Sequence, residues 1–218
     1  GVVKLPGLNA GRTGLTEAAA AAAGHDVITV LGAVDDKAHY YPGAGTFIVK
    51  MIADRTTREF LGIQVLGKGA VDKMVDIAVV ALSMKATVNQ LEHLDFAYAP
   101  PFSTAIHPFG HMINVLLNKI EGKLDSFTPA EFQEGVAEGY TILDPGQAPA
   151  IEGAEFVNLA ETEGELPNHP TDEKLLLVCT KGRRAYLLQN RLKSFGYTNT
   201  RVLEGGTMFN GTELVEEE

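Results

Sequence analysis

Apolar stretches of two kinds divide the first half of the chain. Residues 47–53 and 60–66 are apolar and rich in β-branched side chains, and a polar segment separates them. This pattern predicts an antiparallel pair of strands, and 27–31 predicts a further strand. Helical spacing of apolar residues is clearest over 71–82 and returns after Pro108. The first half is therefore expected to be α+β, an antiparallel sheet with helices.

Two short segments and one rigid loop complete this half. A run of alanines after Thr16 predicts a helix that Gly24 ends, because alanine is the best helix former and threonine is a good N-cap. Residues 87–91 open a second short segment. Pro100 and Pro101 exclude a helix or a central strand and predict an extended loop.

The second half has a different order of elements. Its pattern is weak over 123–136, which is expected to be a linker between domains 1–122 and 137–218. Beyond the linker, short apolar strands flank a helix over 184–195. These strands are expected at 140–143, 156–159, 175–178 and 200–203. Strand, loop, helix and strand in succession predict an α/β domain, a parallel sheet flanked by helices.

Composition and charge exclude several classes of protein. The 218 residues carry a formal net charge of −10, whereas a nucleic-acid binder presents a basic face. No apolar run is long enough to span a bilayer. The single cysteine, Cys179, excludes an internal disulfide or a thiolate metal cluster. We therefore expect a cytoplasmic protein, whose thiols stay reduced.

The candidate chemistry begins at Cys179, where the predicted strand ends. The loop that follows reads Cys179-Thr180-Lys181-Gly182-Arg183-Arg184. Amides at a helix N-terminus carry partial positive charge, glycine lets the backbone curl, and lysine and arginine add charge. Together these features favour the Cys179 thiolate over the thiol and suit a bound persulfide. The alternative is an ordinary buried cysteine at a strand end.

Three motifs carry a resemblance to a known family. They are the Cys179 loop, Gly153-Ala154-Glu155-Phe156-Val157-Asn158-Leu159, and Phe195-Gly196-Tyr197 followed by Val202-Leu203-Glu204-Gly205-Gly206. By these motifs, residues from about 141 to 210 resemble a rhodanese domain. The resemblance implies a persulfide on Cys179, cradled by loop amides, with sulfur moved between small thiols. Pro145 and Ala185 depart from the family pattern.

Two other kinds of site have weaker support. A rhodanese-like phosphatase needs a longer loop than the four residues between Cys179 and Arg184, because phosphate is the larger anion. His107 and His111 have the spacing of two metal ligands on one helix face, but no third ligand is apparent. No metal site is therefore expected.

The first half carries a second resemblance. Its motifs read Arg12-Thr13-Gly14-Leu15-Thr16-Glu17, Tyr40-Tyr41-Pro42-Gly43-Ala44, Leu61-Gly62-Ile63-Gln64, Gly69-Ala70-Val71-Asp72-Lys73 and Leu94-Asp95-Phe96-Ala97-Tyr98-Ala99-Pro100-Pro101-Phe102-Ser103. In order and spacing they resemble the C-terminal dimerisation domain of pyridine nucleotide–disulfide oxidoreductases of the CoA-disulfide reductase, NADH oxidase and polysulfide reductase type. The resemblance implies a homodimer in which Tyr98, with Tyr40 or Tyr41, reaches the partner subunit's active site.

The same resemblance implies a longer parent protein. That family binds FAD and NAD(P)H in preceding domains, so this chain is expected to be a C-terminal piece that binds neither. The leading hypothesis is part of an FAD- and NAD(P)H-dependent CoA-disulfide or persulfide (polysulfide) reductase, with sulfane sulfur carried on Cys179 and CoA persulfide among its substrates. The alternative is a non-catalytic dimerisation or regulatory piece with a degenerate rhodanese domain. Enzymatic activity is expected for the parent and is open for the piece itself.

Overall fold

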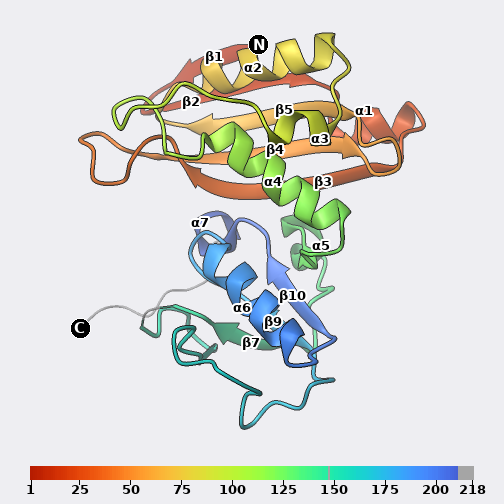
Figure 1. The fold of residues 1–218 in the computed structure, drawn as a ribbon, viewed down its shortest axis with the longest axis vertical. Coiled ribbons are helices and arrows are strands. Elements are labelled where there is room, and N and C mark those ends of the chain that lie inside the picture. Colours follow the sequence, from red (N-terminus) through yellow and green to blue (C-terminus); the bar gives the residue numbers. More distant parts are fainter. Residues whose placement is uncertain (147, 211–218) are drawn as a thin grey trace. The chain divides into compact units, whose positions relative to one another are not determined.

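Two separate sheets organise the chain, one in residues 1–121 and one in residues 122–218 (Figure 1). The computed structural model describes residues 1–146 and 148–210, so the end of the expected second domain lies outside the described residues. Within these ranges, every helix is too short or too polar to cross a membrane.

The first unit is an antiparallel five-stranded sheet in the order β1-β2-β5-β4-β3. Its strands are β1 (Val2–Leu5), β2 (Leu8–Gly14), β3 (Val27–Asp35), β4 (Thr46–Asp54) and β5 (Phe60–Gly67). Its helices are α1 (Glu17–Ala22), α2 (Val71–Ser83), α3 (Val88–Glu92) and α4 (Pro108–Ile120).

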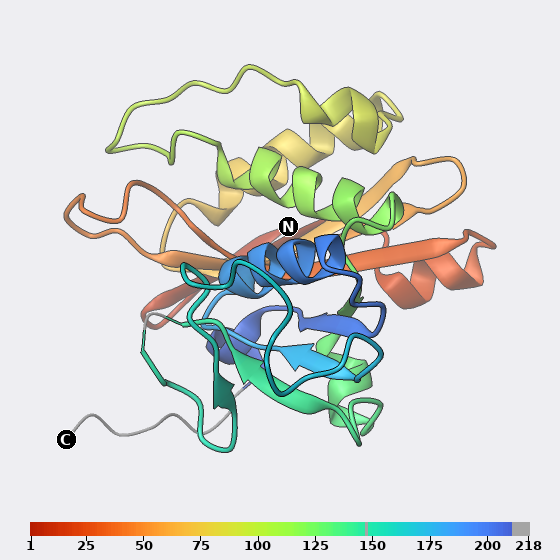
Figure 2. The same ribbon diagram turned by 60° about the horizontal axis from the view of Figure 1, so that its bottom comes forward.

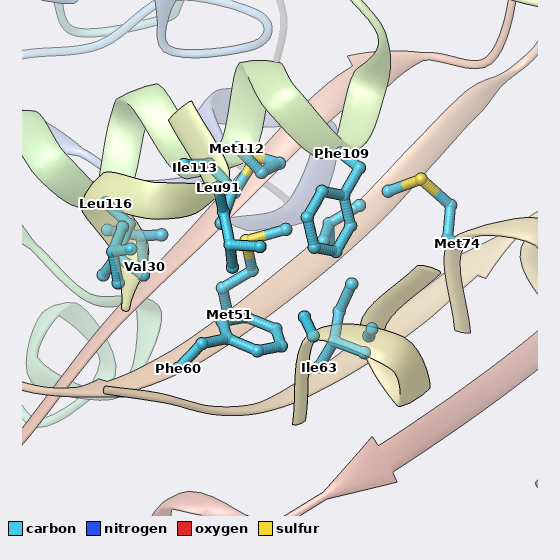
Figure 3. Packing of buried hydrophobic residues seen from close by; sticks show 14 of the residues in the cluster. Val30, Met51, Phe60, Ile63, Met74, Leu91, Phe109, Met112, Ile113 and Leu116 are labelled. Carbon is cyan, nitrogen blue, oxygen red and sulfur yellow. The ribbon is translucent and has the colours of Figure 1, made fainter. Parts of the chain in front are cut away.

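The two faces of this sheet are covered by different helices, because side chains alternate along each strand. Met51 on β4 belongs to the main core with Leu116 of α4, whereas its neighbour Ile52 packs with Ala20 of α1. Figure 2 shows α2, α3 and α4 over one face of the sheet and α1 on the other. In Figure 3 the side chains of α4, including Leu116 and Phe109, point toward those of the strands.

The second unit is a parallel five-stranded sheet in the order β6-β10-β9-β7-β8. Its strands are β6 (Ser126–Phe127), β7 (Thr141–Asp144), β8 (Glu155–Phe156), β9 (Leu175–Leu177) and β10 (Thr200–Leu203). Its helices are α5 (Pro129–Gln133), α6 (Arg183–Ser194) and α7 (Gly206–Asn210). The expected fold class is therefore confirmed for both halves of the chain.

The segment 123–136, expected to be a linker, contributes elements to the second unit. Its strand β6 pairs with β10, with Ser126 opposite Val202. Thr128 then caps α5 by accepting a hydrogen bond from the Glu131 N–H at 3.2 Å. A strand of two residues is too short to show a periodic pattern, so the sequence gives no sign of it.

Candidate functional site

Cys179 lies just beyond β9, the central strand of the parallel sheet. The strand is apolar and buried throughout, as expected in the middle of such a sheet. The N–H of Val178 still donates to the Leu143 carbonyl on β7 at 3.0 Å, so the chain leaves the sheet at Cys179. Open α/β sheets hold their sites at this carboxyl end of the strands. The cysteine is a free thiol and only 4% exposed.

The loop enters α6 through a glycine in the left-handed conformation. Gly182 has φ 85° and ψ −17° and is the N-cap of the helix. The Tyr186 N–H donates to the Gly182 carbonyl at 3.0 Å, so helical hydrogen bonding begins one turn into α6. No side chain in the described part of the chain caps this end. The amides of the first turn can therefore serve an anion held in the loop.

The residues predicted to cradle the anion are consecutive in sequence and lead from the end of β9 into the start of α6. Thr180 and Arg183 are exposed, and Lys181, Gly182 and Arg184 are half-buried. Within residues 1–146 and 148–210, neither arginine of this arc is paired with a carboxylate. Two guanidinium groups without a carboxylate partner among the described residues thus lie at the start of α6, shortly after the thiol.

The short helix α7 holds the same loop from another side. The Thr207 N–H donates to the Cys179 carbonyl at 3.1 Å, and the Met208 N–H donates to the Thr180 carbonyl at 2.9 Å. In a planar trans peptide the carbonyl and the following N–H point in opposite directions. The amides that follow these two carbonyls are therefore turned away from α7. The sequence predicts only a turn at Gly205-Gly206, because five helical residues are too few for a periodic signal.

A second group of titratable side chains lies beside β8, and the sequence pattern does not predict it. His169 is buried between two carboxylates: Nδ1 lies 2.9 Å from Glu173 Oε2, and Nε2 lies 3.1 Å from Glu155 Oε2 in an ion-pair contact. Thr141 Oγ1 donates to Glu173 at 2.6 Å, and the Tyr197 hydroxyl donates to the His169 carbonyl at 2.7 Å. These contacts tie the segment before β9 to β7 and β8.

The two carboxylates set the charge of this group. Burial lowers the pKa of His169, but its contacts with Glu173 and Glu155 outweigh burial and leave the pKa above its ordinary value. The hydrogen bond from Thr141 and the contact with His169 lower the pKa of Glu173. Both shifts favour the pairing of a charged His169 with a charged Glu173.

The tyrosines predicted to act at a partner subunit lie on two connections of the first unit. Tyr40 and Tyr41, between β3 and β4, are 69% and 37% exposed, and Tyr98, between α3 and α4, is 51% exposed. Asp36 closes the first connection by accepting a hydrogen bond from the Gly45 N–H at 2.7 Å. Both connections project from the same end of the sheet (Figures 1 and 2). The three rings are thus accessible within this unit.

His107, one of the two histidines with metal-ligand spacing, caps a helix in the structure. Its Nδ1 accepts a hydrogen bond from the Phe109 N–H at 3.2 Å, and its ring stacks on Phe96 with centroids 4.4 Å apart. Burial, and then the charge of Lys73, lower the pKa of His107 to about 4. In the part of the chain that the structure describes, no group of His, Cys, Asp and Glu side chains could hold a metal ion. The neutral imidazole therefore fixes the start of α4.

Known families match the two units separately. Residues 3–108 match the dimerisation domain of the pyridine nucleotide-disulphide oxidoreductases, and residues 116–208 match the rhodanese-like domain. A curated relative, the NAD(P)H sulfur oxidoreductase (CoA-dependent) of Pyrococcus furiosus, is 34% identical over 115 residues. The aligned part is 53% of this chain and 26% of that protein.

Two solved structures superpose on nearly the whole chain. An NAD-dependent persulfide reductase from A. fulgidus does so with a TM-score of 0.86 and 31% identity, over 96% of this chain and 38% of that one. The Bacillus anthracis protein CoADR-RHD, in its reduced state, gives a TM-score of 0.87 and 27% identity, over 97% of this chain and 39% of that one. The chain therefore spans well under half the length of these relatives.

Proposed function

The chain joins a pyridine nucleotide-disulphide oxidoreductase dimerisation domain to a rhodanese-like domain and is homologous to CoA-disulfide and persulfide reductases, and from this premise we propose that it carries sulfane sulfur on Cys179 for such an enzyme. Its homologues are oxidoreductases. The role proposed for this chain is to accept sulfur from a donor and present it to a small thiol.

One observation supports this role above all. Cys179 follows the central strand and is succeeded by the amino end of α6, which no described side chain caps. Arg183 and Arg184 add charge that no carboxylate among the described residues cancels. Partial positive charge from the helix amides and full charge from the guanidinium groups both stabilise an anion on sulfur. A neutral cysteine that only packs at the end of a strand would need neither the uncapped helix end nor the two arginines.

The proposed transfers are two successive attacks on sulfur. The Cys179 thiolate attacks the outer sulfur of a donor such as thiosulfate, and the sulfur–sulfur bond breaks as sulfite leaves with the electron pair. The outer sulfur of the resulting persulfide bears the negative charge that the loop amides stabilise. An acceptor thiolate, such as that of coenzyme A, then attacks this sulfur and Cys179 leaves as the thiolate. Sulfite leaves in the first step and the Cys179 thiolate leaves in the second, each with the electron pair of the broken bond, so neither step needs an external oxidant or reductant.

FAD and NAD(P)H belong to the parent family, and in our proposal the preceding domains of the parent enzyme bind them rather than this chain. Gly67-Lys68-Gly69 joins the end of β5 to the start of α2, the position of a phosphate-binding glycine turn in dinucleotide-binding folds. However, a side-chain carbon added at Gly69 would lie 2.4 Å from Asp36 Oδ2. The Asp36 carboxylate therefore lies against this glycine turn, and its negative charge disfavours a pyrophosphate there. The sulfur transfers above involve neither cofactor.

The first unit supplies the proposed assembly. A dimerisation domain suggests a homodimer, and Tyr98, Tyr40 and Tyr41 are exposed on connections that project from one end of its sheet. Their phenols can donate hydrogen bonds to a thiolate or sulfur of a substrate bound to the partner subunit. In this proposal the parent enzyme also contains flavin and nicotinamide domains and acts in the cytoplasm.

Intact-mass spectrometry tests the proposal. The chain, incubated with thiosulfate or polysulfide and desalted, is expected to gain one sulfur atom that a reductant removes, and Cys179→Ser is expected to gain none. Ser194→Ala is a matched control, because Ser194 is the last residue of α6 and its hydroxyl donates to the Arg191 carbonyl within its own helix. If no donor produces an adduct on the folded chain, the proposal fails and the non-catalytic alternative is favoured.

A further inference from the structure

We infer that Gly206 is a positioning residue for Cys179. The contact that it allows between α7 and the loop keeps the loop amides turned toward the sulfur-binding side. This inference rests on the proposed role of Cys179 as a sulfur carrier and assigns a further residue to it. Gly206 touches neither a substrate nor the sulfur and acts through two peptide carbonyls.

The space around Gly206 is filled by the backbone of the Cys179 loop. A side-chain carbon added at Gly206 would lie 2.0 Å from the Cys179 carbonyl oxygen and 2.7 Å from that of Thr180. Backbone atoms cannot move aside as the end of a flexible side chain can. Gly206 also has φ 52°, in the left-handed region that favours glycine. Any other residue therefore forces α7 and the loop apart.

The helix that makes this contact is anchored on the sheet. The Glu204 N–H donates to the Phe127 carbonyl on β6 at 3.0 Å. Asn210 closes α7 from its far end, since its Nδ2 donates to the carbonyls of Glu204 and Gly206, each at 2.8 Å. The positions of the Thr207 and Met208 amides are thus set by β6 and β10, independently of the Cys179 loop.

The consequence for the cysteine follows from the planarity of the peptide bond. The two carbonyls are held by the Thr207 and Met208 amides, so the N–H groups on the far side of the same peptides are held as well. If the carbonyls are pushed off α7, these peptides are free to rotate and their N–H groups no longer converge on an anion. The strand β9 precedes the contact, so its pairing with β7 and β10 is not affected.

The test compares two glycine-to-alanine substitutions in the full chain. Gly206→Ala adds the clash, whereas Gly196→Ala adds a side chain at a residue with φ 93° and no heavy atom within 4 Å. Both place alanine in the left-handed region, so they share the backbone cost and differ in the contact. The rate of Cys179 alkylation by iodoacetamide is measured across pH, and sulfur uptake from thiosulfate is measured by intact mass.

Gly206→Ala is expected to slow alkylation about tenfold at neutral pH, which corresponds to about one unit in the midpoint of the pH profile. Gly196→Ala is expected to react as the parent chain does, even if its melting temperature falls. A folded Gly206→Ala variant with the parent's rate and midpoint would overturn the inference. If the parent chain itself takes up no sulfur and alkylates no faster than a free thiol, the proposed function fails instead.

If Gly206→Ala does not fold, a second pair of variants tests whether the contact between α7 and the Cys179 loop positions the loop amides. Met208→Pro removes the N–H that holds the Thr180 carbonyl, and proline is tolerated in the first turn of a helix. Met208→Ala keeps this N–H and is the control. The inference requires slower alkylation in Met208→Pro than in Met208→Ala, and equal rates in the two would contradict it.

Discussion

At the scale of the residue, an ion-paired histidine shortly before Cys179 in the sequence stabilises the second unit. His169 is 8% exposed, faces Glu173 on one side and Glu155 on the other, and has a raised pKa, while the pKa of Glu173 is lowered. A raised histidine pKa stabilises the fold below the ordinary value of 6.5 and loses this contribution as pH rises through the folded value. A lowered glutamate pKa stabilises it above 4.5 and loses this contribution as pH falls. Both contributions to stability are therefore present between pH 4.5 and pH 6.5.

His169→Gln is therefore expected to destabilise the chain more at mildly acidic pH than at alkaline pH. The difference is expected to be about 1.5–3 kcal/mol, the range for a hydrogen bond to a charged group. Urea unfolding of the parent and of the variant at about pH 5.5 and about pH 8.5 measures it. The control is Asn168→Ala, an exposed neighbour. Equal destabilisation at both pH values would show that the imidazole is not charged in the folded state.

Residues that work together are predictable from sequence only when they are also neighbours in sequence. The loop from Cys179 to Arg184 is continuous, so its residue types reveal an anion site before any fold is known. His169 and Glu173 are four residues apart, but Glu155 meets them only because β7 lies between β8 and β9. The role of Gly206 was likewise hidden, because its contact with the Cys179 loop depends on β10 lying beside β9.

At the scale of the element, predictability follows length and periodicity. The helix α2 was expected within a residue of its bounds and the start of α4 was expected at Pro108, because each helix has three turns or more of periodic apolar residues. Strand β2 was missed because Gly11 and Gly14 suggest a turn. The structure gives a reason for the first of these glycines, since a side-chain carbon there would lie 2.8 Å from Val75 of α2. Close packing of a helix on a strand explains a glycine that the strand pattern alone does not.

The first unit depends on α4 for its core. Leu116→Ala is expected to destabilise the chain by about 2–5 kcal/mol, because Leu116 is fully buried in the main core and truncation leaves a cavity. Val80→Ala on α2 is the control, since Val80 is 60% exposed. Denaturant unfolding measures both variants. A Leu116→Ala chain as stable as the Val80→Ala chain would contradict this assignment of the core.

At the scale of the whole molecule, two units with unlike sheets each carry part of the proposed function. The antiparallel unit matches a dimerisation domain and exposes tyrosines, and the parallel unit matches a rhodanese-like domain and holds Cys179. The motifs of both families are short, continuous runs of residues, so the order of the two units was predictable from the sequence. The membership of 123–136 in the second unit was not, because it depends on the pairing of β6 with β10.

The central claim is that Cys179 accepts sulfur from a donor and passes it on to a small thiol. A single-turnover chase tests this claim most directly. The chain is loaded with one sulfur from thiosulfate, freed of donor, mixed with coenzyme A and followed by intact mass, while the small-molecule products are identified in parallel. The protein is expected to lose its added sulfur as coenzyme A persulfide forms in equal amount, and the free Cys179 thiol is expected to return. Sulfur that stays on Cys179 in the presence of coenzyme A and other small thiols, and leaves only under strong reduction, would contradict the account.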